Sequence, residues 1–329
     1  MRRYYPLQSE EKSAQSSFLG KFRIVANFQQ WGIILVLILL VIVLGISSPV
    51  FLSARNIRNI LQQVSTLGIL SMGMTVLMIS GGIDLSVGSS ISVVSVIVGK
   101  LLKAGVPVGI PIVLGLLTGC FIGLINGLLA SHTRAHPFIL TLGTMTLLQG
   151  VAIIITEGYP ITDLGDKFEW IGGATIGKVP FIVILFFVVM FFCFFILKYT
   201  RLGRKAYAIG GNEYTTYLAG IRVKTFKIIF YMICGFLTGL ASLVLSSRIS
   251  SAIPTMGTGF ELQSIGAVVI GGTPLTGGRG SVWGTLTGVL LLGIIANGLN
   301  LLHVEASWQY VVTGAVIIFA VILHEHRRG

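Results

Sequence analysis

Residues 179–197 read VPFIVILFFVVMFFCFFIL, nineteen consecutive positions without an Asp, Glu, Lys or Arg. At about 1.5 Å of rise per residue, a helix of this length nearly spans the roughly 30 Å hydrocarbon core of a bilayer. An α-helix also pairs its own backbone polar groups, which lipid cannot do. The segment therefore predicts a membrane-spanning helix.

The rest of the chain has the same character. Of its 329 residues, 54% are hydrophobic and 10% are charged, and the mean hydropathy is +0.92, whereas soluble domains carry about 25% charged residues. The predicted fold class is all-α: a polytopic membrane protein with about ten transmembrane helices. The intervals poor in charge predict spans at residues 31–48, 60–80, 85–103, 108–130, 137–156, 180–198, 227–248, 261–276, 282–302 and 307–323.

The distribution of Lys and Arg predicts the orientation. An even number of spans puts both termini on one side, and a cytoplasmic location for them leaves 16 of the 23 Lys and Arg residues in cytoplasmic segments, as the positive-inside rule requires. Arg55, Arg58, Lys100 and Lys103 would then lie outside, so a count that differs by one hairpin stays open. The predicted organisation is a cytoplasmic segment at 1–30, one transmembrane domain at 31–323 with a cytoplasmic loop at 199–226, and a cytoplasmic tail at 324–329.

Several other functional classes are disfavoured. The net charge of +12 comes from basic residues scattered between apolar runs, so no nucleic-acid partner is expected. Residues 172–179, GGATIGKV, resemble a phosphate-binding loop but have Val179 where its Ser or Thr should follow Lys178. His132 and His136 have no nucleophile or third metal ligand beside them. The chain is predicted not to be an enzyme, and no bound metal or cofactor is expected.

A stripe of glycines marks one face of the fourth predicted span. Gly115, Gly119, Gly123 and Gly127 recur every four residues and therefore lie on one side of the helix. Without side chains there, another backbone can approach closely, so the stripe indicates helix packing. The alternative is a solute path lined by backbone, for which Asn126 would supply a polar side chain.

A carboxylate lies between the second and third predicted spans. Residues 80–89 read SGGIDLSVGS, with Asp84 and Gly88 in the middle of a glycine-rich link. Asp84 is expected to cap the helix that begins at Leu85, because a carboxylate accepts hydrogen bonds at the positive end of a helix. The alternative is a direct role in solute passage, since charged groups within membranes are often functional.

A second glycine-rich link separates the eighth and ninth predicted spans. Residues 271–280 read GGTPLTGGRG and include Gly271, Gly272 and Gly278. Unpaired backbone is tolerated at membrane depth only where protein or water meets it. The link is therefore expected to be a tight cytoplasmic turn, with a re-entrant element as the alternative.

Several stretches together resemble the ribose-type branch of the ABC transporter permease family, almost from end to end. The most specific are GIDLSVG at 82–88 and AVVIGGTPLTGGRGS at 267–281, joined by NIRNILQQ at 56–63, PFILTLG at 137–143 and residues 203–221. The resemblance implies a multi-pass permease subunit in the bacterial cytoplasmic (inner) membrane that imports a monosaccharide such as ribose. It also implies an ABC ATPase subunit that hydrolyses ATP, an extracytoplasmic sugar-binding protein, a second permease copy and surrounding lipid as partners.

In that family, the loop between the sixth and seventh spans resembles the coupling element that docks on the ATPase. Here residues 210–221 form a short helix-forming stretch bounded by glycines and surrounded by basic residues, as a contact surface requires. Thr215 and Thr216 stand where related chains usually have two alanines. The alternative is an ordinary basic loop that binds anionic lipid. The candidate coupling residues are Gly210, Asn212, Glu213, Thr216, Ala219 and Gly220.

Sugars need hydrogen bonds and no counter-charge, which fits the few charged residues within the spans. The candidate path residues are therefore Ser86, Asn126, Thr141 and Asn297. The main rival is an ion-coupled secondary transporter of small polar solutes, for which Asp84 would be the coupling group. An intramembrane enzyme would need paired carboxylates, a Ser-His pair or a metal cluster, and the sequence has none of these patterns. The motifs are shared by importers of several sugars and do not select one.

Overall fold

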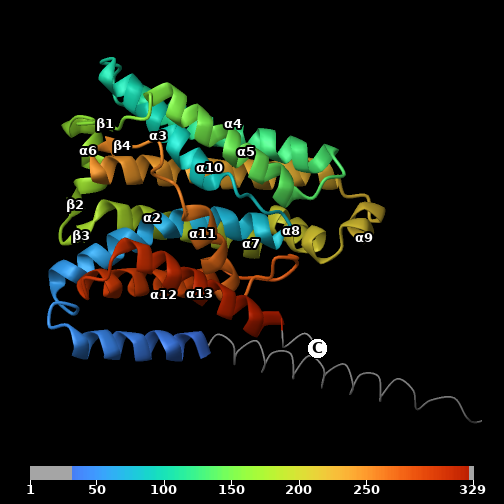
Figure 1. The fold of residues 1–329 in the computed structure, drawn as a ribbon. Helices are drawn as coiled ribbons and strands as arrows, with labels where there is room; N and C mark the ends of the chain where they lie inside the picture. Colours follow the sequence, from blue (N-terminus) through green and yellow to red (C-terminus); the bar gives the residue numbers. More distant parts are fainter. Residues whose placement is uncertain (1–31, 326–329) are drawn as a thin grey trace, which may run out of the picture.

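The computed structural model describes residues 32–325, so the predicted segment at 1–30, Trp31 and residues 326–329 lie outside it. In the described part every predicted apolar interval contains a helix, and the helices lie side by side in one elongated bundle (Figure 1). The principal helices are Gly32–Ser47, α2 (Ala54–Ile79), α3 (Val87–Lys103), α4 (Gly109–His132), α5 (Pro137–Thr156), α7 (Phe181–Tyr199), α10 (Val223–Ile249), α11 (Phe260–Ile270), α12 (Val282–Leu301) and α13 (Ala306–Glu325).

Six of these helices, α2, α4, α5, α7, α10 and α12, are long and apolar enough to cross a membrane by length and composition. The all-α, polytopic membrane class is thereby confirmed. The strands in the described part are all two residues long, and they form two small antiparallel pairs at the bundle surface.

The two ends of the bundle are different. One end carries the strand pairs and a short helix (Figure 1). These are β1 (Ile161–Thr162) paired with β4 (Ser251–Ala252), β2 (Thr175–Ile176) paired with β3 (Val179–Pro180), and α6 (Asp166–Gly173). The other end carries α8 (Arg201–Gly211) and α9 (Glu213–Leu218), and both ends of the described chain point toward it. We call these the strand end and the α8–α9 end.

Three predicted boundaries are wrong, each for a physical reason. The second helix begins at Ala54 and not near residue 60, because the Ser53 hydroxyl accepts the Asn56 amide (3.2 Å) and the charged first turns remain helical. The third begins at Val87 and not at Leu85, after a stretch held by side chains. The eighth ends at Ile270 and not near 276, because Gly272 takes a left-handed φ of +91°.

Glycines determine how closely the central helices pack. The predicted stripe on α4 faces α10, where a Cβ added at Gly119 would lie 2.4 Å from the Gly235 carbonyl oxygen. At Gly123 it would lie 2.3 Å from the Tyr231 carbonyl oxygen. The packing role of the stripe is therefore confirmed, and the two backbones touch directly.

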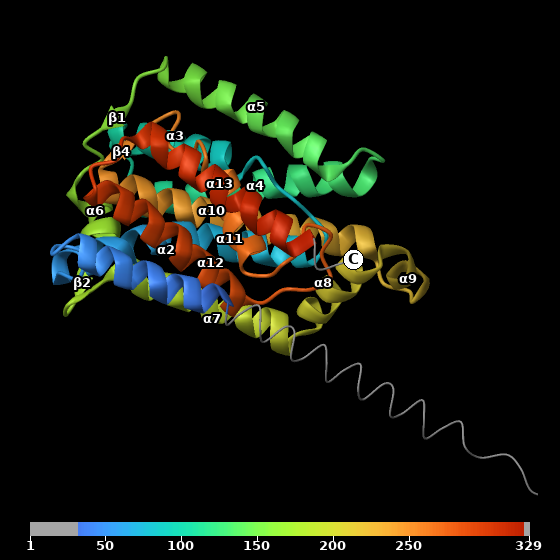
Figure 2. The same ribbon diagram turned by 60° about the horizontal axis from the view of Figure 1, so that its bottom comes forward.

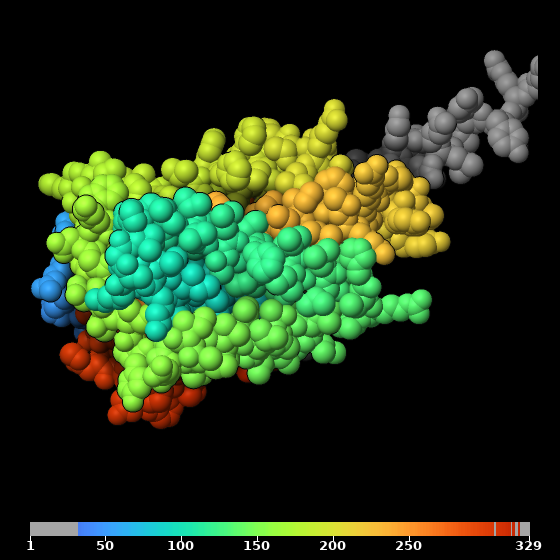
Figure 3. Space-filling model, turned by 90° about the horizontal axis from the view of Figure 1, so that it is seen from above, coloured from blue at the N-terminus to red at the C-terminus, as the bar shows by residue number. Residues whose placement is uncertain are grey.

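The helices are not equally enclosed. Most of α2 is buried among α7, α10, α11 and α12, whereas only four of the twenty residues of α5 are buried. Figure 3 shows the green residues of α5 along the edge of α3 and α4 at the molecular surface, and Figure 2 shows α5 standing out from the other helices. This leaves much of α5 on a face that this chain does not cover.

The α4–α10 contact gives a direct test of packing. We expect Gly119→Ala to lower the free energy of unfolding by about 1–3 kcal/mol, because the new methyl overlaps backbone. Gly45→Ala is the matched control, since its Cβ would make an ordinary contact of 3.5 Å with Leu52 and alanine raises helix propensity by up to about 1 kcal/mol. The midpoints of thermal unfolding of the two variants, measured in the same detergent, test this expectation. Equal midpoints for the two variants would contradict the packing shown here.

Candidate functional site

The chain between α2 and α3, residues 80–86, is not helical, and we call it the first break. The Ser80 hydroxyl donates to the Leu77 carbonyl (2.6 Å), and Gly81 turns the chain with a φ of +80°. The break then runs back into the bundle, so that α3 begins inside it (Figure 1). Asp84 and Ser86 are fully buried there, at 2% and 0% exposure.

Asp84 is held by hydrogen bonds from neutral groups. Its Oδ1 accepts the Ser86 backbone amide at 2.8 Å and the Ser86 hydroxyl at 2.7 Å. The Asn126 side-chain amide of α4 donates to both carboxylate oxygens, at 3.2 and 3.1 Å, and to the Ser86 hydroxyl at 2.7 Å. In the described residues Asp84 forms no ion pair. The carboxylate therefore organises the chain just before α3. It does not cap the helix as predicted, because it accepts the amide of Ser86, the N-cap residue itself, and α3 has no side-chain cap hydrogen bond.

Two other helices hold the same break. The Leu85 amide donates to the Thr141 hydroxyl of α5 at 3.2 Å, and the Tyr231 hydroxyl of α10 donates to the Ile83 carbonyl at 3.0 Å. The structure thus brings three predicted path residues, Ser86, Asn126 and Thr141, together around Asp84. All three are buried and hydrogen-bonded, so they face the break and not an open surface.

The fourth candidate, Asn297 of α12, lies elsewhere. Its side chain exchanges two hydrogen bonds of 2.9 Å with Asn56 at the start of α2. Asn56 also donates to the Phe51 carbonyl at 2.9 Å. This reciprocal amide pair joins α12 to α2 and has no contact with the Asp84 cluster.

The short helices α3 and α11 meet near their first turns. A Cβ at Gly88 would lie 2.0 Å from a Glu261 carboxylate oxygen and 2.6 Å from the Gly257 carbonyl. Glu261 in turn accepts the Gly259 amide, and the Gly257 amide donates to the Ser92 hydroxyl at 3.1 Å. Gly88 is therefore the contact between α3 and the segment before α11.

Residues 271–281, the second break, close the α8–α9 end of the bundle. Gly271 packs on α12, where its Cβ would lie 2.4 Å from the Gly284 carbonyl. The Gly278 amide donates to the Ile79 carbonyl at the end of α2 (2.9 Å). Gly272 and Gly278 both have a left-handed φ, so the tight turn expected here needs glycine at these positions.

Gly210 of α8 fits into the same junction. A Cβ there would lie 2.0 Å from the Ile79 carbonyl oxygen and 2.4 Å from the Gly278 amide. The Tyr207 hydroxyl, also on α8, donates to the Gly280 carbonyl at 3.0 Å. The two breaks and α8 thus touch through backbone atoms. We call this contact of Gly210, Ile79 and Gly278 the glycine junction.

In the predicted coupling element, residues 210–221, polar contacts fix α9 to its neighbours and three side chains point outward. Asn212 caps α9 by accepting the Thr215 amide (2.9 Å), and the Thr216 hydroxyl donates back to the Ala208 carbonyl (2.9 Å). Glu213 pairs with Lys227 of α10. Ala219 and Gly220, the latter at a φ of +80°, end the helix. The outward side chains are Tyr214, Tyr217 and Leu218, which are 65–70% exposed.

A polar surface between α5 and α13 was not predicted from the sequence. Gln149 of α5 donates to the Pro254 carbonyl at 2.9 Å, and Gly259 lies against Tyr310 of α13 and Gln263 of α11. Thr258, in the same segment, is exposed. These residues are uncharged and far apart in the chain, so no local motif could have identified them.

Comparisons with known proteins match most of the chain. The family model described as "Branched-chain amino acid transport system / permease component" matches residues 56–321. Ribose import permease protein RbsC of Bacillus subtilis is 44% identical over 297 residues, which is 90% of this chain and 92% of that protein. Its namesake in Escherichia coli K12 is 41% identical over 300 residues, 90% and 93% of the two chains.

A third relative, the D-allose transport system permease protein AlsC of Escherichia coli K12, is 36% identical over 312 residues, covering 94% of this chain and 96% of its own. No solved structure gives a significant match.

The Asp84 cluster predicts strong coupling between two side chains. We expect Asp84→Ala and Asn126→Ala to be non-additive by about 1–2 kcal/mol in unfolding free energy, since each leaves the same buried bonds unmade. Asp84→Ala combined with Asn297→Ala should be additive within about 0.5 kcal/mol, because these residues share no partner. Reversible unfolding in mixed detergent measures both cycles. Equal coupling in the two pairs would disprove a local cluster.

Proposed function

The chain belongs to the ribose-type branch of the ABC importer permeases, and from this premise we propose that it forms the translocation path for a monosaccharide, with ribose the first candidate. An extracytoplasmic binding protein delivers the sugar, and a separate ATPase subunit hydrolyses the ATP that drives import. The observation that carries the proposal is the glycine junction, which ties α8 to both breaks in the bundle.

The proposed topology has about ten spans with both termini in the cytoplasm, in the bacterial cytoplasmic membrane. The α8–α9 end is the cytoplasmic one, since residues 198–227 hold seven basic residues against Glu213 alone. The strand end carries acidic Glu157, Asp163, Asp166 and Glu169. Lys103, one of the exceptions to the charge rule, pairs there with Asp163 at 3.4 Å.

We assign α9 to the contact with the ATPase. A helix of six residues cannot bury Tyr214, Tyr217 and Leu218 on its own chain, and it projects from the end of the bundle (Figure 1). Aromatic side chains of this kind are enriched at protein interfaces. The Asn212 cap, the Glu213–Lys227 pair and the Thr216 bond fix α9 on α8 and α10, so a force on α9 is passed to α8.

The sugar path is proposed to run along the face between α5 and α13, where a second copy completes it. Gly143 and Gly150 of α5 have open space around their missing Cβ atoms, which allows another helix to approach. Gln149, Thr258 and Gln263 supply uncharged hydrogen-bonding groups on this face. Ser86, Asn126 and Thr141 then hold the first break behind the path, and Asn297 holds α12 beside it.

The mechanism needs two states of this arrangement. ATP binding in the partner subunit would favour one position of α9 over the other, because only a ligand with different affinity for two states shifts their populations. Movement of α8 would reach the first break through Gly210 and Ile79. The start of α3 would shift with the break and open the path toward one side or the other.

Sugar uptake into proteoliposomes tests the proposal. With ATP, the ATPase and the binding protein all present, we expect uptake that falls at least tenfold in Gly220→Pro, because proline cannot adopt the φ of +80° found there. Gly211→Ala is the control, since its Cβ would meet no atom within 4 Å. Uptake by this chain alone under a proton or sodium gradient would establish the ion-coupled alternative in its place.

A further inference from the structure

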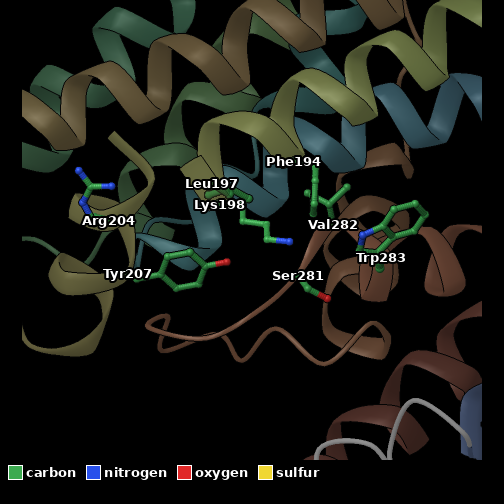
Figure 4. Close-up of a pocket in the computed structure, with 8 residues that line it drawn as sticks. All are labelled: Phe194, Leu197, Lys198, Arg204, Tyr207, Ser281, Val282 and Trp283. Carbon is green, nitrogen blue, oxygen red and sulfur yellow. The ribbon is translucent and has the colours of Figure 1, made fainter. Parts of the chain in front are cut away.

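A pocket at the base of α7 has no role in the proposed path. It has a volume of about 400 Å³, within the range of small-molecule sites. The residues that line it come from the end of α7, from α8 and from the start of α12, and they are Phe194, Leu197, Lys198, Arg204, Tyr207, Ser281, Val282 and Trp283 (Figure 4).

The pocket is positively charged. Lys198 and Arg204 form no ion pair with a carboxylate in the described part of the chain, and no acidic residue lines the pocket. Figure 4 shows the Lys198 ammonium pointing between the Tyr207 hydroxyl and the Trp283 indole, with Arg204 at the edge beyond Tyr207. Two unneutralised cations at one pocket favour an anionic occupant.

The start of α12 strengthens this preference. Ser281 caps the helix by accepting the Gly284 amide at 3.0 Å, while the amides of Val282 and Trp283 have no acceptor among the described residues. Free amides at a helix N-terminus carry a partial positive charge and bind phosphate oxygens. The indole N–H of Trp283 adds a further donor. Burial raises the pKa of the Tyr207 phenol, so this side chain stays neutral at pH 7.

The other half of the pocket is apolar and continues onto the membrane-facing side of α7. Phe194 and Trp283 pack edge to face with their ring centroids 6.0 Å apart, and the Lys198 Nζ lies 5.1 Å from the centroid of the Phe194 ring. Beyond the pocket, α7 exposes Phe187, Phe191, Phe192 and Phe195. An occupant with both an anionic group and acyl chains satisfies both halves, whereas a free anion would use only one.

We propose that this pocket holds the phosphodiester headgroup of an anionic phospholipid, with its acyl chains along α7. Basic pockets between membrane helices on the cytoplasmic side are suited to such headgroups, and aromatic residues mark the same depth. The inference rests on the proposed function only for the choice of leaflet, because the proposed orientation of the chain places the pocket in the cytoplasmic leaflet. The lipid would join α7 and α8 to α12 and thereby stabilise the position of α8.

Native mass spectrometry of the purified full chain tests this site without any transport assay. We expect phosphatidylglycerol to bind at least tenfold more tightly than phosphatidylethanolamine with the same acyl chains. In the double variant Lys198→Gln/Arg204→Gln, the ratio of the affinities for the two lipids should fall about tenfold. The control Arg222→Gln/Lys224→Gln also removes two positive charges, near α9 and outside the pocket, and should keep the preference for phosphatidylglycerol.

A second measurement covers the case in which the double variant does not fold. Phosphatidylglycerol with brominated acyl chains should quench the fluorescence of Trp283, and Trp283→Phe should remove that part of the quenching. Equal binding of the two lipids, an equal loss in the control variant, or displacement of the lipid by millimolar inorganic phosphate would overturn the proposal. Displacement by the ATPase subunit would also overturn it and assign the pocket to that protein interface.

Discussion

Membrane helices cannot rely on the hydrophobic effect to pack, because lipid tails are as apolar as their side chains. In this chain, backbone contact at glycines takes its place. Gly119 touches the backbone of Gly235 between α4 and α10, and Gly271 touches that of Gly284 between the second break and α12. A single methyl at such a position overlaps main-chain atoms, which cannot move as a flexible side chain can. The architecture therefore depends on these close approaches.

The same constraint links the functional parts. The glycine junction puts α8 in contact with the end of α2 and with the second break, and the first break begins one residue after Ile79. From there, Asp84 and Ile83 accept hydrogen bonds from α4 and α10, and the Leu85 amide donates one to α5. A displacement of α8 thus has a continuous path of backbone and buried polar contacts to the middle of the bundle. The pocket at the base of α7 lies beside this path.

Much of this could be predicted from the sequence, because apolar length and glycine spacing are local signals. Each apolar interval in the described part contains a helix. Gly119, Gly123 and Gly127 face the backbone of α10, while Gly115 faces side chains. Helix ends were less predictable: charges at Arg55 and Arg58 concealed the true start of α2, which is fixed by the Ser53 hydroxyl.

The arrangement of the polar residues required the fold. Ser86, Asn126 and Thr141 meet around one carboxylate, but Asn297 pairs with Asn56, and nothing in the spacing of these residues separates the two cases. The surface of Gln149, Thr258 and Gln263 exists only because α5 contacts the segment before α11, where Gln149 donates to the Pro254 carbonyl, so no local pattern reveals it.

The most direct test of this account is the ratio of sugar imported to ATP hydrolysed by the reconstituted transporter, compared between Gly210→Ala and Gly211→Ala. The first variant places a methyl 2.0 Å from the Ile79 carbonyl oxygen, while the second meets nothing within 4 Å. If the glycine junction couples α8 to the breaks, Gly210→Ala still hydrolyses ATP but imports at least tenfold less sugar per ATP, and Gly211→Ala behaves as the wild type. An unchanged ratio in a well-folded Gly210→Ala transporter would contradict coupling through the glycine junction.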